Sequence, residues 1–127
     1  MASRGQRSAA WRRSHRLAIW VFRLSRRLPS VEQHALVAEL RRAAAAIPAL
    51  ISAHDSASSA AQKVELLQTG RQRAFDIDAL LDMVSALAYL HPFQVGLMRR
   101  EAREIIELLD AQRQNIERGA NRRTDSL

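Results

Sequence analysis

The sequence predicts an all-α protein, an antiparallel up-down-up-down four-helix bundle, and three observations support this. Hydrophobic residues make up 47% of the 127 residues, while there are only four glycines and three prolines, a composition typical of helices. Apolar residues recur every three or four positions in four stretches, and no strand-like alternation competes with them. The connections between the stretches are short, which favours antiparallel packing of consecutive helices. The length fits one domain with a single core.

The first predicted helix spans residues 10–28 and follows a flexible basic arm over residues 1–9. Its inward residues recur at spacings of four, three and four: Leu17, Val21, Leu24 and Leu28. Trp11 and Phe22 are placed on the same apolar side. At about 100° per residue, five arginines fall on the opposite side of the helix: Arg12, Arg16, Arg23, Arg26 and Arg27. The helix is therefore amphipathic, and arginine dominates its polar face.

The second predicted helix spans residues 31–53. Ser30 and Gln33 form a capping-box pattern at its start. Its inward residues are Leu36, Leu40, Ala43, Ala44, Ile47 and Ile51. Pro48 lies inside the helix, where a missing N–H and a ring clash predict a kink. The four alanines before it allow another helix to approach closely.

The third and fourth predicted helices span residues 58–90 and 92–118. The third has its inward residues at Val64, Leu67, Ala74, Ile77, Leu81, Val84 and Ala88, with Leu80, Met83 and Leu87 beside them. The fourth has Val95, Met98, Ala102, Ile105, Ile106, Leu109 and Ile116. Gly119 is expected to end the fourth helix. The bundle thus covers residues 10–119, and residues 120–127 form a polar tail.

The net charge of +7 is concentrated in the first quarter of the chain. Residues 1–31 contain eight arginines and no acidic residue, whereas the remaining residues contain 12 basic and 13 acidic ones. Such asymmetry favours a surface that faces a polyanion. The candidate nucleic-acid-binding residues are Arg4, Arg7, Arg12, Arg16, Arg23, Arg26 and Arg27.

Several features of the chain match a known family along most of its length. They include Leu28-Pro29, Leu40-Arg41-Arg42-Ala43-Ala44, Asp76-Ile77-Asp78 and Tyr89-Leu90, and the structural motif residues are Trp11, Arg42, Ile47, Pro48 and Ile51. With these the chain resembles the small bacterial four helix bundle proteins that include those encoded in intervening sequences of large-subunit ribosomal RNA genes. More distantly it resembles the accessory variability proteins of diversity-generating retroelements.

The resemblance implies a homo-oligomer, a pentamer in which five bundles form a barrel. One motif departs from the family: Ser, Asn and Glu-Gly of its usual Ser-Ile-Pro-x-Asn-Ile-Ala-Glu-Gly are absent from Ala46-Ile47-Pro48-Ala49-Leu50-Ile51-Ser52-Ala53-His54. The apolar phase is intact, so the expectation for the fold stands, while any role of that polar motif is in doubt.

The chain lacks the residue patterns of common catalytic and metal sites. It has no cysteine, none of its four histidines has a carboxylate three residues before it, as a di-iron bundle site requires, and no His-x-x-x-His pair is present. Asp76, Asp78 and Asp82 are interpreted as a solvated face or as partners of arginines on another helix. Glu101, Glu104 and Glu107 are assigned to ion pairs along the fourth helix. We expect no enzyme, no cofactor and no metal.

Three hypotheses for function remain open. The first is a non-catalytic, oligomeric scaffold that binds RNA or DNA phosphates without sequence specificity. The second is a protein-interaction adaptor, such as an accessory subunit for a reverse transcriptase or another acidic partner. The third is a membrane-surface module that uses the amphipathic first helix, and it is the weakest of the three if Leu17, Val21 and Leu24 lie in the core. Without a secretory signal or an apolar run long enough to span a membrane, the expected location is cytoplasmic.

Overall fold

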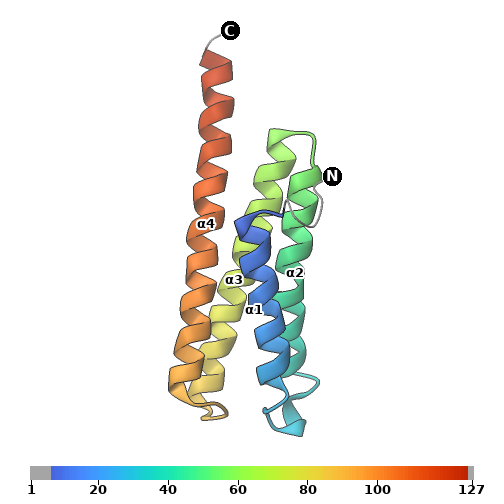
Figure 1. The fold of residues 1–127 in the computed structure, drawn as a ribbon, viewed down its shortest axis with the longest axis vertical. Coiled ribbons are helices and arrows are strands. Elements are labelled where there is room, and N and C mark those ends of the chain that lie inside the picture. The colour runs from blue at the N-terminus through green and yellow to red at the C-terminus, as the bar shows by residue number, and fades with distance from the viewer. Residues whose placement is uncertain (1–6, 126–127) are drawn as a thin grey trace.

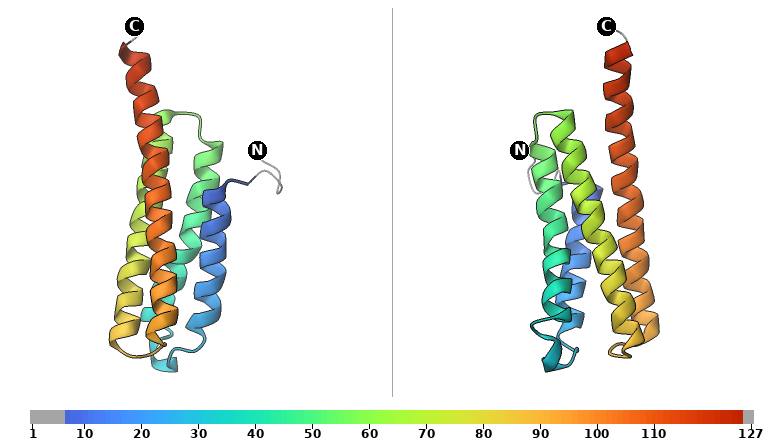
Figure 2. Two further views of the ribbon diagram at one scale, coloured as in Figure 1. Left: turned by 60° about the vertical axis from the view of Figure 1, so that its left-hand side comes forward. Right: turned by 180° about the vertical axis from the view of Figure 1, so that it is seen from behind.

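The computed structural model describes residues 7–125, which form four α-helices and one short 3-10 helix (Figure 1). The helices are α1 (Ala9–Ser25), α2 (Leu36–Ser56), α3 (Ala60–Ala86) and α4 (Pro92–Asp125), and the 3-10 helix η2 (Ser30–Glu32) lies between α1 and α2. Consecutive helices pack side by side and run in opposite directions, as two further views show (Figure 2). The predicted all-α four-helix fold is confirmed.

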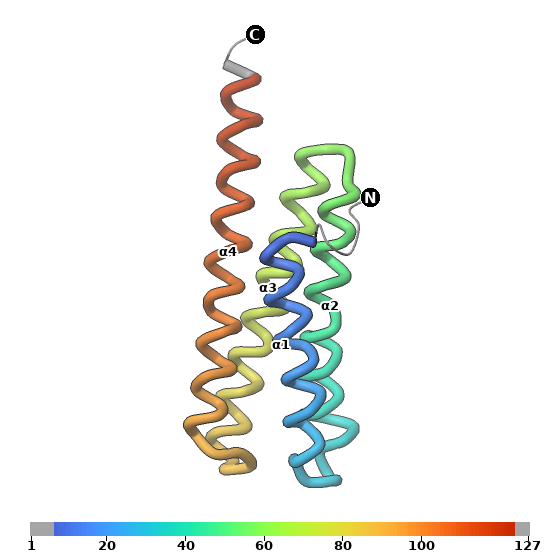
Figure 3. Tube along the Cα trace, in the orientation of Figure 1, coloured from blue at the N-terminus to red at the C-terminus, as the bar shows by residue number. Residues whose placement is uncertain are grey.

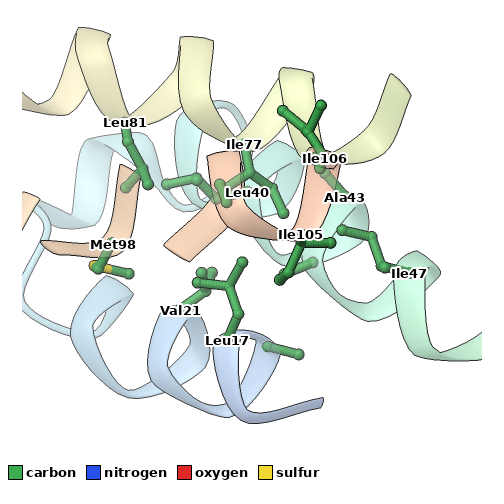
Figure 4. Packing of buried hydrophobic residues seen from close by; sticks show 14 of the residues in the cluster. Leu17, Val21, Leu40, Ala43, Ile47, Ile77, Leu81, Met98, Ile105 and Ile106 are labelled. Carbon is green, nitrogen blue, oxygen red and sulfur yellow. The ribbon is translucent and has the colours of Figure 1, made fainter. Parts of the chain in front are cut away.

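The core lies between the four helices and receives side chains from each of them (Figure 4). Leu17 and Val21 of α1 are each 1% exposed, and Ile47 of α2 is equally buried. Ile77 of α3 and Ile105 of α4 are fully covered. Burial of each such side chain contributes about 1.5–3 kcal/mol relative to leaving it in water. The predicted inward faces of all four helices are therefore confirmed at their centres.

The start of α2 differs from its prediction. The expected capping box at Ser30 and Gln33 is not formed: residues 30–32 form η2, and α2 begins at Leu36 after Ala35, which makes no side-chain cap. Val31 is 80% exposed, whereas Leu36 is buried. A helix begun at Val31 would have no core to pack against in its first turn, so the α-helix starts where burial begins.

The end of α3 also differs. The helix stops at Ala86 rather than at Leu90, and Ala88 has a positive φ of 59°. The amide of Tyr89 bonds the carbonyl of Val84 and that of Ala88 bonds Ser85, which is the Schellman arrangement. An alanine here carries a steric cost that glycine would avoid. The prediction that Ala88 faces inward is wrong, since it is exposed in the turn.

The predicted end of α4 is wrong as well. The helix passes through Gly119 and continues to Asp125, so the residues assigned to a polar tail are helical up to that point. A glycine ends a helix when it takes a positive φ, and no glycine among residues 7–125 does so. Ile116 and Gly119 line a depression together with Ala60 and Lys63 of α3, which shows that α3 accompanies α4 this far.

The helices differ greatly in length, and this decides which surfaces are open. At 1.5 Å per residue, α1 with 17 residues is about 26 Å long and α4 with 34 residues about 51 Å. The tube view shows α4 extending well beyond α1 and past the connection between α2 and α3 (Figure 3). α1 is thus a short outer member of the bundle with one side free.

α2 continues through Pro48 as one helix, and the kink at that residue stays a prediction.

Candidate nucleic-acid interface

The exposed side of α1 carries a row of arginines. Because Leu17, Val21 and Leu24 are buried, the residues about half a helical turn away from them point out of the bundle. Ser8 caps the helix by accepting a hydrogen bond from the Trp11 amide, and this sets the register of the arginines that follow. The arginines that are exposed in α1 and in the turn after it are Arg12, Arg16, Arg23, Arg26 and Arg27.

Those five side chains have no ion-pair partner within the part of the chain that the structure describes. No carboxylate oxygen of residues 7–123 lies within 4.0 Å of their guanidinium groups. Arg12 instead donates to the backbone carbonyl of Arg7, which leaves its charge uncompensated. We call Arg12, Arg16, Arg23, Arg26 and Arg27 the α1 arginine face.

Two further arginines near α1 have partners in the bundle. Arg13 donates to Glu101 of α4 at 3.0 and 3.1 Å and also bonds Glu104, and the hydrogen bond to Glu101 raises the pKa of Arg13. Arg7 lies over the Trp11 ring, 3.8 Å from its centroid, and donates to Ser52 of α2 at 3.5 Å. Arg13 was not a candidate, and its pairing with two carboxylates agrees with that. Arg7 was a candidate, but it is held against Trp11 and Ser52. Arg4 lies outside the described residues.

An open groove of about 960 Å³ follows the outward side of α1 and reaches α4 at Glu101. Arg12, Arg16 and Arg23 line it, and so do Trp11, His15 and Trp20. Trp11 packs half-buried against the core, as predicted, and it also lines the groove. The prediction that Phe22 lies on the core side is wrong, because Phe22 is 38% exposed. The bundle core is already filled by smaller side chains, so these larger rings lie at its border.

The carboxylates of α3 and α4 serve the bundle itself. Asp78 accepts from Arg99 at 2.8 Å and Asp82 accepts from the same arginine at 2.9 Å, so the predicted pairing with another helix is confirmed. The prediction for α4 was partly wrong: Glu101 pairs across to Arg13, and Glu104 is shared between Arg13 and Arg100. Within residues 7–125, no cluster of three or more carboxylate or histidine side chains is arranged to hold a metal ion.

The remaining predicted motif residues are structural. Ile47 and Ile51 are buried in the core. Arg42 is exposed and pairs with Glu39 one turn earlier. Pro48 lies within α2 near these residues and is half-buried. None of the four contributes to the groove on α1.

The apolar side of α1 is not available to a lipid surface. Leu17 and Val21 are 1% exposed and Leu24 is 8% exposed, which makes the membrane-surface hypothesis the weakest of the three. Within residues 7–125 no helix combines the length and the apolar character needed to cross a bilayer.

Comparison with known proteins places this bundle in a family. Residues 6–111 match the family model described as 23S rRNA-intervening sequence protein, and the chain belongs to that family. A solved structure of a protein with unknown function from the S23 ribosomal protein family of Bacteroides thetaiotaomicron is similar in fold. Its TM-score is 0.77 at 19% sequence identity, and the alignment covers 83% of this chain and 98% of that one.

The match to the family model confirms the family that was expected from Trp11 and the segment around Ile47-Pro48. A search among curated proteins finds no match. The more distant relation to the accessory proteins of retroelements stays a prediction.

Proposed function

We propose that this protein is a non-catalytic scaffold that binds RNA or DNA phosphates through the α1 arginine face without reading base sequence. One observation carries the proposal: five exposed arginines lie on or directly after one helix, and no carboxylate side chain of residues 7–123 lies within 4.0 Å of them. Guanidinium groups bind phosphate bidentately and keep their charge at all relevant pH values. A row of them attracts a polyanion by releasing its counterions.

The family supplies supporting context of a general kind. Its printed description refers to an intervening sequence of 23S rRNA, and we take this as compatible with a partner made of nucleic acid. We also propose that the chain forms a homo-oligomer, a pentamer by the resemblance described above, and that it acts in the cytoplasm without a cofactor. The mass of the native assembly measured by light scattering tests the oligomeric part independently of binding.

Salt dependence tests the binding. The probe is a generic single-stranded RNA of mixed sequence, and its affinity is measured by fluorescence anisotropy from 50 to 200 mM salt. If four phosphates are contacted, the log–log slope is about −2.8, so the fourfold rise in salt weakens binding about 50-fold. The variant Arg12→Gln/Arg16→Gln/Arg23→Gln/Arg27→Gln is expected to lose most of this affinity and most of the slope.

A matched control removes the same charge from α3 and α4. Arg71→Gln/Arg73→Gln/Arg100→Gln/Arg103→Gln also lowers the net charge by four, but each of these arginines is paired with a carboxylate. It is expected to retain binding, provided circular dichroism shows the helices intact. Equal losses of RNA affinity in both variants would show that binding depends on the overall charge and not on the α1 arginine face. Absence of binding at 50 mM salt would overturn the proposal.

An acidic protein is the competing occupant of the same face. Poly-glutamate of similar charge distinguishes the two, because it offers carboxylates without phosphates or bases. Weaker binding of poly-glutamate than of RNA supports the proposal. Equal or tighter binding of poly-glutamate would overturn it in favour of the adaptor hypothesis, which a neighbouring reverse-transcriptase gene with template and variable repeats would then strengthen.

A further inference from the structure

The groove on α1 is lined by both arginines and aromatic rings. Attraction of a polyanion by charge requires the arginines but not the rings. Trp20 lines it beside Arg16 and Arg23. Trp20 is half-buried, so part of its indole packs on the core while part faces the groove. Ile19 next to it is 40% exposed. Exposed apolar surface of this kind favours a ligand that brings apolar surface of its own.

The positions of the three groove residues allow them to act on one ligand. Arg16 precedes Trp20 by four residues and Arg23 follows it by three. Residues three or four apart on a helix are surface neighbours, with Cβ atoms about 5–6 Å apart. The indole therefore has a guanidinium group within reach on the turn before it and on the turn after it.

The other aromatic group in the groove is already occupied. Trp11 stacks on His15 with centroids 4.7 Å apart and an interplanar angle of 14°, and Arg7 lies over the same indole. For Trp20, by contrast, no ring stacking or cation contact is found within residues 7–125. Trp20 is thus the aromatic surface of the groove that is open to a ligand.

The acidic residue of the groove does not oppose an anion. Glu101 is the carboxylate among the lining residues, and it accepts two hydrogen bonds from Arg13. Its charge is therefore balanced inside the bundle, and the field in the groove is set by the uncompensated arginines.

From this arrangement we propose that the groove binds single-stranded nucleic acid, with an unpaired base stacked on Trp20 and the flanking phosphates held by Arg16 and Arg23. A duplex presents its phosphates but keeps its bases stacked inside, so it cannot use the indole. Stacking on an aromatic side chain accepts any base, which agrees with binding that is independent of sequence. This inference rests on the proposed function and narrows its ligand.

The experiment compares three polyanions of equal charge: a single-stranded oligonucleotide, a duplex, and inorganic polyphosphate, which has no bases. The variant Trp11→Phe leaves Trp20 as the one tryptophan, since the chain has two. The single strand is expected to quench the fluorescence of Trp20, and polyphosphate is expected to bind without comparable quenching.

A substitution that keeps apolar volume then tests the contribution of the ring. Trp20→Leu is expected to weaken the single strand about 5- to 150-fold, the range for loss of one stacked base, and to leave polyphosphate binding unchanged. Trp20→Phe is expected to restore much of the affinity. Phe93→Leu is the control, because Phe93 is 69% exposed at the start of α4 and does not line the groove.

The outcomes separate this inference from the function on which it rests. All three polyanions could bind in a salt-dependent way, with affinities that Trp20→Leu does not change. That result would overturn the stacking site but would still support phosphate binding by the arginines. Equal loss of single strand and polyphosphate in Trp20→Leu would also overturn it, because the ring would then act through the fold. Absence of binding by all three would overturn both.

Discussion

Arginines on the two sides of this bundle have different surroundings. On α3 and α4, Arg71, Arg73, Arg99, Arg100, Arg103 and Arg113 each have a carboxylate within 4.0 Å. On α1 and the turn after it, five arginines have no such partner within residues 7–125. The same side chain thus stabilises contacts between and along helices on one side and leaves its charge available on the other.

The difference arises from what each helix faces. α3 and α4 are long, contact each other along most of their length and alternate basic with acidic residues, so pairs form across and along them. α1 is short, has no acidic residue and turns its arginines other than Arg13 to solvent. Besides sharing the apolar core with α4, it pairs Arg13 with the carboxylates of Glu101 and Glu104. Position in the fold, and not residue type, decides the role of each arginine.

The largest expected effect compares one arginine from each side. Arg99 donates to Asp78 and to Asp82, and the hydrogen bond to Asp78 raises the pKa of Arg99. Arg99→Gln is expected to lower the free energy of unfolding by about 1–2 kcal/mol, because charged hydrogen bonds are lost. Arg23→Gln is expected to change it by less than about 0.5 kcal/mol. Urea denaturation measures both, and equal costs would contradict the comparison.

A smaller loss of stability is expected for Arg13, which lies on α1 but is paired with carboxylates like the arginines of α3 and α4. Because it bonds Glu101 and Glu104, Arg13→Gln is expected to cost about 0.5–1.5 kcal/mol of stability. Its effect on RNA affinity is expected to be smaller than that of Arg16→Gln. A larger loss of RNA affinity for Arg13→Gln than for Arg16→Gln would show that pairing within the bundle does not decide which arginines bind.

The smallest expected effect on stability concerns the uncharged hydroxyl of Tyr89, which joins the end of α3 to η2. Tyr89, after α3, donates to Glu32 of η2 at 2.9 Å, and this hydrogen bond raises the pKa of Tyr89. The folded chain then holds the phenol proton to a higher pH than the unfolded chain, whose tyrosine pKa is about 10. The contribution is therefore complete below pH about 10 and is lost as the pH rises through the folded-state pKa.

Thermal unfolding of the protein and of Tyr89→Phe between pH 8 and pH 11 tests this. The stability of the unsubstituted protein is expected to fall more steeply above pH 10 than that of the variant. The comparison isolates the phenol because it is the one tyrosine of the chain. Parallel curves for the two proteins would show that the hydrogen bond does not contribute.

The ends of the helices show where prediction from the sequence stops. Gly119 has the residue type that ends helices but stays helical, and Ala88 lacks it but takes the left-handed conformation. Ser30 and Gln33 have a capping pattern that is not used. In each case local preference is worth about 1 kcal/mol, which is less than the burial of one or two side chains of the neighbouring helix.

The functional residues divide in a similar way. The arginines of α1 could be named from the charge distribution, because they lie far from Leu17 and Val21 on the helix. The pairing of Arg13 could not, since its partners Glu101 and Glu104 are 88 and 91 residues away in the chain. The position of Trp20 in a groove could not be predicted either, since it depends on how α1 lies against α4.

The sequence by itself determined the four helices, their inward faces and the location of the excess charge. These follow from spacing along a helix of known period, which is a local property. The tertiary structure decided which arginines are neutralised, where each helix ends and which aromatic ring is open to a ligand. These depend on distances between residues far apart in the chain, and only the packing of the helices sets those distances.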